Sequence, residues 1–476
     1  MKKIRIIGGG LAGPEAALQA ASLGCNVALY EMRPTRSTEA HQTADFAELV
    51  CSNSLKSESE NTAPWLLKQE MRRAGSILLA EADASSVPAG HALAVDRVEF
   101  SRRVAERIAA FTTGPDARIT IHREEVTTLN PDEPDTLTIL ATGPLTSPAL
   151  AAELQRLTGS DHLAFYDSIS PIVDASTIDM DKVFFAARYD KGTADYINCP
   201  FTKEEYETFL DALTTAEAVP LKGWEGNALS LLSSRSEVEG SASLPPAAPA
   251  PAHYFEGCLP IEETARRGRD TLRFGPMKPV GLTDPKTGRW PYAAVQLRQE
   301  NLRADSYNLV GFQNHLKFGE QARVLRLIPG LENATFLRYG QIHRNTYIDA
   351  PNLLTETLQL RAHPSILIAG QLSGIEGYTE SIASGLLAGR YAAALARGQQ
   401  PAPAPRATAN GSLSYYITHA LNPEKHKRFQ PANITFDLLP PLEEELRRKI
   451  RDKKERHKIQ CDRALEAWDA WLAASH

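Results

Sequence analysis

Three glycines near the start of the chain have the spacing of a loop that binds a pyrophosphate. Residues 4–7 predict a short buried strand, and the residues that follow are Gly8, Gly9, Gly10, Leu11, Ala12 and Gly13. In the pattern Gly-x-Gly-x-x-Gly, the first glycine permits a tight turn and the second lets the backbone approach a pyrophosphate. The third lets a helix pack closely on the strand. We expect this helix over about residues 14–23, with its N-terminal N–H groups pointing at the pyrophosphate.

An acidic residue follows at the place where such a site needs one. Residues 26–30 predict a second strand, and Glu31 comes directly after it, 18 residues beyond Gly13. A carboxylate at this position accepts hydrogen bonds from an adenosine ribose. Strand, glycines, helix, strand and acid in this order predict a Rossmann-like dinucleotide site.

Two later glycine turns belong to the same predicted site, and the second of them decides which dinucleotide is expected. Ala141, Thr142 and Gly143 follow a predicted strand over residues 136–140, at the carboxyl end where doubly wound sheets bind ligands. Another predicted strand, residues 365–369, leads into a turn with Gly370, Gln371 and Gly374 and then into a helix of small residues. Flavoproteins of the glutathione-reductase type close such a late strand–glycine–helix unit over the flavin ring. The sequence therefore favours FAD over NAD as the bound dinucleotide.

The order of these elements predicts an α/β fold: an FAD-binding Rossmann-like (glutathione-reductase type) domain with an inserted α+β domain. We expect residues 1–180 to form the first part of the FAD-binding domain and residues 181–313 the insert, with a Pro/Ala-rich loop at 240–253. Residues 314–398 would complete the FAD-binding domain. Residues 399–476 would hold a linker and a basic helical region, with one long helix over about 442–472.

Composition excludes several classes of protein. The 476 residues carry a net charge of −6, which argues against a generally basic coat for nucleic acid. No apolar run approaches the ~18 residues of a membrane span and no signal peptide is evident, so we expect a cytoplasmic protein without membrane contact. The cysteines are widely spaced, so no metal site or disulfide framework is expected. They are Cys25, Cys51, Cys199, Cys258 and Cys461.

A basic stretch near the C-terminus has two interpretations. Within residues 447–458, eight of twelve residues are Lys or Arg, and another basic cluster stands at residues 425–428. One interpretation is a solvated helix face with ion pairs four residues apart. The other is a surface that contacts RNA phosphates.

The whole chain resembles the bacterial folate- and FAD-dependent tRNA (uracil-54-C5)-methyltransferases (the TrmFO family). Beside the first glycine loop, the resemblance rests on residues 49–54 (LVCSNS), 254–260 (YFEGCLP), 271–279 (TLRFGPMKP), 291–298 (PYAAVQLR) and 370–378 (GQLSGIEGY). It implies C5-methylation of uridine 54 in the tRNA T-arm. The carbon would come from 5,10-methylenetetrahydrofolate, with FADH2 as reductant and NAD(P)H as electron source, and no obligate protein partner is implied.

The resemblance also implies roles for two cysteines. A thiolate that adds to uracil C6 makes C5 nucleophilic enough to attack a methylene group, and hydride delivery from reduced flavin then leaves a methyl group. Cys258 matches the family's nucleophile, and Cys51 is expected near the flavin ring, although the two roles can be exchanged. The remaining cysteines, Cys25, Cys199 and Cys461, are expected to be buried and inert.

Candidate contacts to the tRNA and the folate follow from the same resemblance. Flipping the target base out of the T-arm has an energetic cost that phosphate contacts would offset. Candidates for these contacts are Arg266, Arg267, Arg269, Lys278, Arg298 and the C-terminal basic helix. Tyr378 is a candidate for stacking on the pterin. Two other functions stay open: an NAD(P)H-dependent flavin oxidoreductase, and a tRNA-binding flavoprotein that transfers no methyl group.

Overall fold

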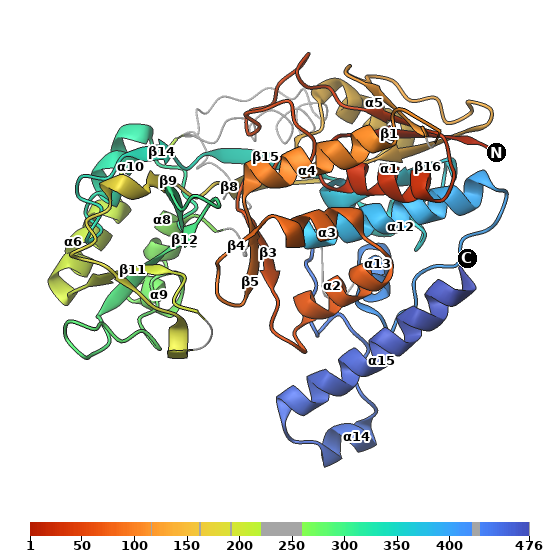
Figure 1. Ribbon diagram of the computed structural model, residues 1–476. Helices are drawn as coiled ribbons and strands as arrows, with labels where there is room; N and C mark the ends of the chain where they lie inside the picture. Colours follow the sequence, from red (N-terminus) through yellow and green to blue (C-terminus); the bar gives the residue numbers. More distant parts are fainter. Residues whose placement is uncertain (116, 161–162, 191–192, 220–258, 421–428, 476) are drawn as a thin grey trace, which may run out of the picture.

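The computed structural model describes residues 1–475 except 116, 161–162, 191–192, 220–258 and 421–428. Figure 1 shows a larger domain that contains the chain's N-terminus, a smaller domain beside it, and a C-terminal helical arm that extends from the larger domain. In the part of the chain described, no helix is long and apolar enough to cross a membrane. The same residues contain no cluster of three or more His, Cys, Asp or Glu side chains suited to a metal ion.

A parallel sheet of five strands forms the centre of the larger domain. Its strands are β1 (Lys3–Ile7), β2 (Val27–Tyr30), β6 (Ile119–His122), β7 (Thr136–Leu140) and β16 (Ile366–Ile368). Their order is β16-β7-β1-β2-β6, and every neighbouring pair is parallel. The strands are short apolar runs because helices cover the sheet. The predicted α/β class and Rossmann-like arrangement are confirmed.

Two helices of small residues cross closely on this sheet. They are α1 (Ala12–Ser22) and α12 (Tyr378–Ala396). A Cβ atom on Gly385 would lie 2.3 Å from the carbonyl oxygen of Ala12, and one on Gly389 would lie 2.6 Å from that of Ala16. Glycines therefore set the distance between the helices. The first helix starts at Ala12, two residues earlier than expected.

A glycine separates two consecutive helices, α2 (Ala63–Arg73) and α3 (Ile77–Ala84). Gly75 lies between them with φ of +73°, and the Ser76 side chain accepts the Leu79 N–H as the cap of α3. The next helix is α4 (Arg97–Ala110), capped by Asp96. A small antiparallel sheet lies nearby, formed by β3 (Ser54–Ser57), β4 (Ser86–Val87) and β5 (Ala92–Val95).

The smaller domain is built on an antiparallel six-stranded sheet of order β10-β11-β12-β13-β9-β14. Its strands are β9 (Ile172–Asp174), β10 (Phe184–Phe185), β11 (Ile197–Phe201), β12 (Ala293–Gln299), β13 (Ser306–Leu309) and β14 (Phe336–Arg338). Its helices are α6 (Lys203–Thr215), α8 (Ile261–Arg266), α9 (Thr271–Phe274) and α10 (Phe318–Leu325). Because β9 and β14 pair within it, this unit extends beyond the predicted residues 181–313 at both ends. The predicted loop at 240–253 lies outside the described residues.

The remaining elements connect the domains and form the arm. β8 (Leu163–Ser168) pairs with β15 (Ile342–Tyr347) as the chain leaves and re-enters the larger domain. The other helices are α5 (Pro148–Thr158), α11 (Ala350–Leu353), α13 (Ala409–His419), α14 (Glu444–Lys449) and α15 (Lys453–Ala474). The single helix predicted over 442–472 is thus two helices, because Asp452 caps a new start. The indole N–H of Trp468 anchors the arm by donating to the Glu70 carbonyl oxygen at 2.7 Å.

Candidate active site

A cleft of about 330 Å³ lies at the carboxyl ends of the parallel strands, where open α/β sheets bind their ligands. It brings together residues from five parts of the sequence. The lining includes Gly8, Gly9, Gly10, Leu11, Ala12, Glu31, Arg33, Cys51, Ala141, Thr142, Gly143, Gly370, Gln371 and Tyr378. The cleft is large enough for a small-molecule site and collects nearly all of the residues expected to bind a dinucleotide.

The first glycine loop has the shape its pattern predicts. A Cβ atom on Gly8 would lie 2.3 Å from the Ala141 carbonyl oxygen, and one on Gly13 would lie 1.8 Å from that of Gly8. Gly10, by contrast, has no atom within 4 Å of its hypothetical Cβ position, so its backbone is open to the cleft. No side chain caps the first turn of α1, which leaves its N–H groups available to an anion. Gly13 serves helix packing and does not line the cleft.

Glu31 is fixed at the end of β2 by a partner that the sequence did not indicate. One carboxylate oxygen accepts the Gly9 N–H at 2.8 Å, and the other accepts the backbone N–H and the Nε–H of Arg33, both at 2.9 Å. Burial acts to raise the pKa of Glu31, but the hydrogen bonds and charge of Arg33 outweigh it and lower that pKa. The carboxylate is therefore ionised at neutral pH and oriented towards the cleft that it lines.

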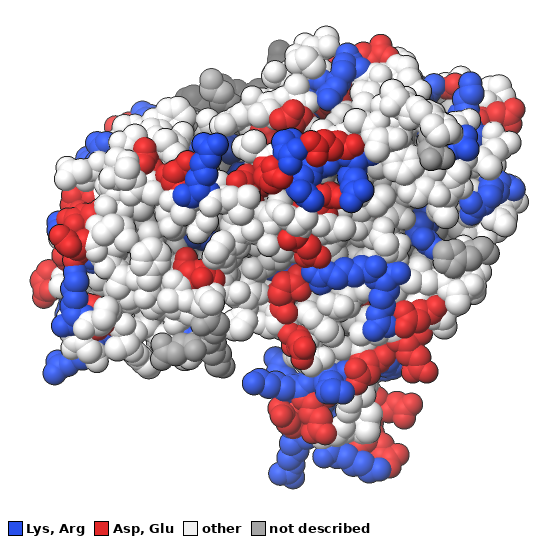
Figure 2. Space-filling view, viewed as in Figure 1, with Lys and Arg blue, Asp and Glu red and all other residues white. Residues whose placement is uncertain are grey.

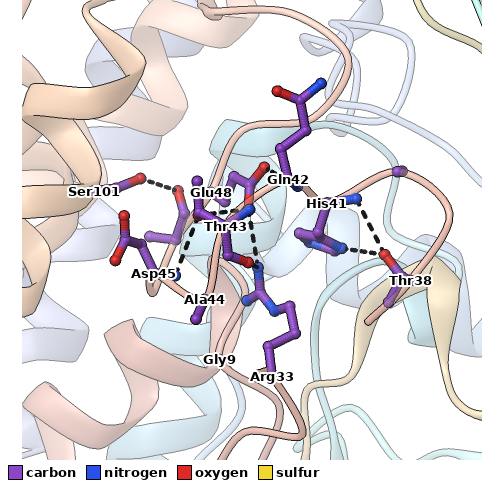
Figure 3. A network of polar contacts seen from close by, with 12 residues as sticks. Gly9, Arg33, Thr38, His41, Gln42, Thr43, Ala44, Asp45, Glu48 and Ser101 are labelled. Atoms are coloured by element: carbon purple, nitrogen blue, oxygen red, sulfur yellow. Dashed lines mark hydrogen bonds and ion pairs between the residues drawn. The ribbon is translucent and has the colours of Figure 1, made fainter. Parts of the chain in front are cut away.

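Arg33 also holds the loop that follows (Figure 3). Its Nη1 lies 3.1 Å from a carboxylate oxygen of Glu48. Glu48 in turn accepts hydrogen bonds from the backbone N–H of Gln42 and from both the N–H and the hydroxyl of Thr43. Residues 41–48 thus form a compact turn along one wall of the cleft.

Cys51 lies in this wall and its backbone is held by a tyrosine from the other end of the chain. The Tyr378 hydroxyl oxygen accepts the N–H of Cys51 at 2.7 Å and that of Ser52 at 3.3 Å. Burial raises the pKa of Tyr378 well above its ordinary value, so the hydroxyl keeps its proton. The ring of Tyr378 lines the cleft, and its suggested stacking on a pterin stays a prediction.

Arg97, the first residue of α4, holds the same loop through a backbone carbonyl group. Arg97 donates to the Leu49 carbonyl oxygen at 2.8 Å and forms an ion pair with Glu300 at 2.7 Å. Burial acts to lower the pKa of Arg97, but Glu300 outweighs it and raises that pKa. The thiol of Cys51 lies within electrostatic range of Arg97 and of Arg338. Cationic neighbours of this kind favour a thiolate.

Arg298 was expected to contact tRNA phosphates, and the structure shows that this prediction is wrong. The side chain is only 7% exposed. Its guanidinium donates to the Asn53 side-chain oxygen at 2.9 Å and to the Ser52 hydroxyl at 2.8 Å. The residue belongs to β12, most of whose residues are buried, so this cation supports the Cys51 loop from the smaller domain.

The late glycine turn closes the other side of the cleft. Gly370 and Gly374 have φ values of +72° and +85°, which favour glycine. The Gly370 N–H donates to the Ser384 hydroxyl at 2.7 Å, which ties the turn to α12. A Cβ atom on Gly374 would lie 2.5 Å from the Phe429 ring, so this glycine packs behind the cleft and does not line it. No side chain caps α12, so a second helix N-terminus faces the site.

The other cysteines fall into two groups. Cys25, Cys199 and Cys461 are fully buried, as expected for inert thiols, and burial raises the pKa of each. For Cys461 the pKa rises to about 12. Cys258, the predicted nucleophile, lies outside the described residues, and its position relative to Cys51 stays a prediction.

Several of the basic residues proposed as tRNA contacts form ion pairs with acidic side chains. Arg266 pairs with Glu263, and Arg269 lies 2.8 Å from Asp211, while Lys278 is exposed. On the arm, Lys449 pairs with Glu445 and Lys458 with Asp462, each at 2.8 Å and four residues apart. Figure 2 shows Lys and Arg mixed with Asp and Glu along the arm. This pattern favours the solvated-face interpretation, and RNA contact by the arm stays a prediction, as does contact by Arg267. The cluster at 425–428 lies outside the described residues.

Comparison with known proteins agrees with this geometry. The profile of the family described as "Glucose inhibited division protein A" matches residues 3–400. A Koribacter versatilis protein named methylenetetrahydrofolate–tRNA-(uracil-5-)-methyltransferase TrmFO is 64% identical over 99% of this chain and 98% of its own. A protein of the same name from Solibacter usitatus is 59% identical over 99% of this chain and 99% of its own. Another from Enterococcus faecalis is 51% identical over 98% of this chain and 97% of its own. Aquifex aeolicus GidA shares the fold with a TM-score of 0.67 at 16% identity, covering 100% of this chain and 74% of its own.

Proposed function

The chain belongs to the family of methylenetetrahydrofolate–tRNA-(uracil-5-)-methyltransferases and is an enzyme of that kind, and we propose that it methylates C5 of uridine 54 in the tRNA T-loop. We further propose FAD as its bound cofactor and NAD(P)H as the source of electrons. The observation that carries this proposal is the single cleft that joins the first glycine loop to Cys51 and to the late glycine turn.

The cleft has the features that an FAD molecule requires. Gly10 leaves the backbone open where the pyrophosphate would lie, beside the uncapped start of α1. Glu31 offers its ionised carboxylate to the adenosine ribose. Gly370, Gln371 and Tyr378 would enclose the flavin ring next to Cys51. Bound there, reduced FAD supplies the hydride that turns a methylene group into a methyl group.

The residues around Cys51 prepare a thiol for proton transfer or for a covalent role. Tyr378 fixes the backbone of Cys51 and Ser52, and Arg97 and Arg298 hold the flanking residues. With the loop fixed on three sides, the thiol keeps one position relative to the flavin end of the cleft. The charges of Arg97 and Arg338 stabilise its ionised form.

Cys258 would provide the nucleophile that adds to uracil C6. The bond that forms joins its sulfur to C6, and the electron pair of the C5–C6 double bond moves to make C5 nucleophilic. Attack of C5 on the folate-borne methylene would form a C5–CH2 bond, and loss of the C5 proton would then break the bond between that carbon and the folate nitrogen, which leaves as tetrahydrofolate. A hydride, for which reduced FAD would be the source, would reduce the remaining methylene to a methyl group, and elimination of the sulfur would restore the C5–C6 double bond. Cys51, which lines the cleft, would accept or return a proton at the flavin end.

Replacing Cys258 tests this proposal against the two other functions. The variant Cys258→Ala should lose methyl transfer, while its flavin content and its reduction by NAD(P)H stay at wild-type levels. Cys199→Ala is the matched control, because Cys199 is buried in the smaller domain away from the cleft. Methyl transfer by Cys258→Ala at the rate of the control would contradict the proposal. A wild-type protein that oxidises NAD(P)H but never methylates tRNA would point to a plain flavin oxidoreductase.

A further inference from the structure

Three aromatic rings form a strip on the surface of the smaller domain, which we call the aromatic strip: Phe318, Phe336 and Tyr339. Tyr339 stacks with Phe318 at 5.5 Å between ring centroids and 24° between planes, and with Phe336 at 5.3 Å and 27°. Phe318 opens α10 and Phe336 opens the edge strand β14, which lie side by side in Figure 1. Phe318 is 54% exposed. Phe336 and Tyr339 are partly exposed beside it, so the three stacked rings leave an apolar surface on which a planar group can stack.

Phe318 of the strip also lines a second cleft. This cleft, of about 220 Å³, has Phe318 and His315 on one wall and Glu39 and Ala40 of the larger domain on the other. Ala40 packs with Val50 in a small cluster that Cys51 also contacts. From the end of β14, Arg338 donates to the Ala40 carbonyl oxygen at 3.2 Å. Ala40 therefore connects the second cleft, which Phe318 lines, with the packing around the Cys51 loop.

The charges around the strip indicate what kind of group it binds. Lys317, next to Phe318, forms an ion pair with Glu217 at 2.5 Å, and Arg323 on α10 pairs with Glu320 at 2.6 Å. Glu39 adds a carboxylate at the second cleft. A phosphate would gain little at such a surface, whereas a flat aromatic ring is attracted to the exposed ring face by stacking alone.

We propose that the aromatic strip stacks with an unpaired base of the tRNA that neighbours the target uridine. This inference rests on the proposed function, because it takes tRNA as the methyl acceptor. Proteins that recognise single-stranded RNA stack splayed bases on aromatic side chains. A base held on Phe318 stabilises an opened T-loop and offsets part of the cost of unstacking the target base.

The test measures binding of an unmodified tRNA transcript to the FAD-loaded enzyme, without folate, for Phe318→Ala and Phe318→Trp. We expect the Kd to rise roughly tenfold for Phe318→Ala and to return to the wild-type value for Phe318→Trp, because stacking needs a ring. Phe185→Ala is the matched control. Phe185 is 50% exposed and lies on β10, at the opposite edge of the same sheet, so its removal should leave the Kd within about twofold.

Failure of this inference is distinct from failure of the proposed function. An unchanged Kd for Phe318→Ala, or an equal loss for Phe185→Ala, would overturn the inference even if the enzyme methylates tRNA. A raised KM for methylenetetrahydrofolate with an unchanged Kd for tRNA would also overturn it, since the strip would then bind the folate. If the Kd for tRNA rises in Phe318→Ala but the wild-type enzyme transfers no methyl group, the inference would be supported and the proposed function contradicted.

Discussion

The Tyr378 hydroxyl accepts the backbone N–H of Cys51 at 2.7 Å across 327 residues of sequence. This bond links the late glycine turn to the loop that carries the thiol. The same tyrosine therefore forms part of the cleft wall and fixes the position of Cys51. It also explains why a tyrosine stands at the start of α12, where its ring forms cleft wall and its hydroxyl satisfies two N–H groups.

Tyr378→Phe should lower the rate of methyl transfer about tenfold while the enzyme keeps its FAD. Two partly buried N–H groups lose their acceptor, which costs about 1–3 kcal/mol and loosens the Cys51 loop. The measurement is kcat for methyl transfer together with flavin content. Tyr416→Phe is a suitable control, because the Tyr416 hydroxyl donates to the Gln430 carbonyl oxygen, and neither residue lines the cleft. Equal kcat values for Tyr378→Phe and wild type would show that the bond does not position the loop.

Arg298 and Lys278 should differ in how salt affects tRNA binding. Lys278→Ala removes an exposed cation and should reduce the slope of log Kd against log salt by about one if it contacts a phosphate. Arg298→Lys should leave that slope unchanged and instead lower stability and kcat, because the single nitrogen of a lysine does not reproduce the planar fork whose two nitrogens donate to Asn53 and Ser52. A salt slope that changes in Arg298→Lys would mean that this buried side chain does reach the RNA.

Two glycines of the first loop, Gly10 and Gly13, should fail in different ways when replaced by alanine. Gly13→Ala should impair folding, since its Cβ would lie 1.8 Å from the Gly8 carbonyl oxygen. Gly10→Ala should fold normally, because open space surrounds its Cβ position, but it should lose FAD by obstructing the pyrophosphate. Thermal unfolding and flavin absorbance of the purified variants check both results. Full FAD binding by Gly10→Ala would place the pyrophosphate elsewhere.

Stability should fall as the pH rises from about 4.5 to about 7, because of two buried glutamates. Burial raises the pKa of Glu15 and of Glu70 to about 7, although each accepts N–H groups from a helix start, Glu15 from α3 and Glu70 from α13. A carboxyl whose pKa is higher in the folded state binds its proton more tightly there, so its stabilising contribution is present at low pH. That contribution is lost as the pH passes through the folded-state pKa.

Glu70→Gln should remove the share of this dependence that Glu70 contributes, leave that of Glu15, and be more stable than wild type at pH 8, by on the order of 2 kcal/mol. The free energy of unfolding of both proteins at pH 5.5 and pH 8 gives the comparison. Glu106→Gln is the control, since Glu106 is 62% exposed on α4. The same pH dependence in Glu70→Gln as in wild type would show that Glu70 stays ionised in the fold.

The parallel sheet and the cleft could be predicted because their signals are local. Apolar runs that end in glycine mark β1, β7 and β16, and the carboxyl ends of parallel strands must meet at one edge of the sheet. In the smaller domain the strands are short, and β10 is only two residues long, so no alternation of polar and apolar residues marks them. Its extension through β9 and β14 follows from pairings that no local pattern reveals.

The two arginines that hold the Cys51 loop could not be predicted from the sequence for the same reason. Arg97 meets Glu300 across 203 residues, and Arg298 meets Asn53 across 245. Each arginine stands on a helix or strand whose local sequence looks ordinary, and only the docking of the two domains brings it to the loop. Arg298 was misjudged as a surface cation because an arginine in sequence carries no mark of burial.

The most direct test of methyl transfer uses tRNA transcript, NAD(P)H and methylenetetrahydrofolate labelled in its methylene carbon, followed by nucleoside digestion and mapping. We predict that the label appears in 5-methyluridine at position 54 of the transcript. It should vanish when uridine 54 is replaced by cytidine, and S-adenosylmethionine should not substitute for the folate. No label at position 54 from an enzyme that holds FAD and binds the transcript would contradict the proposed function.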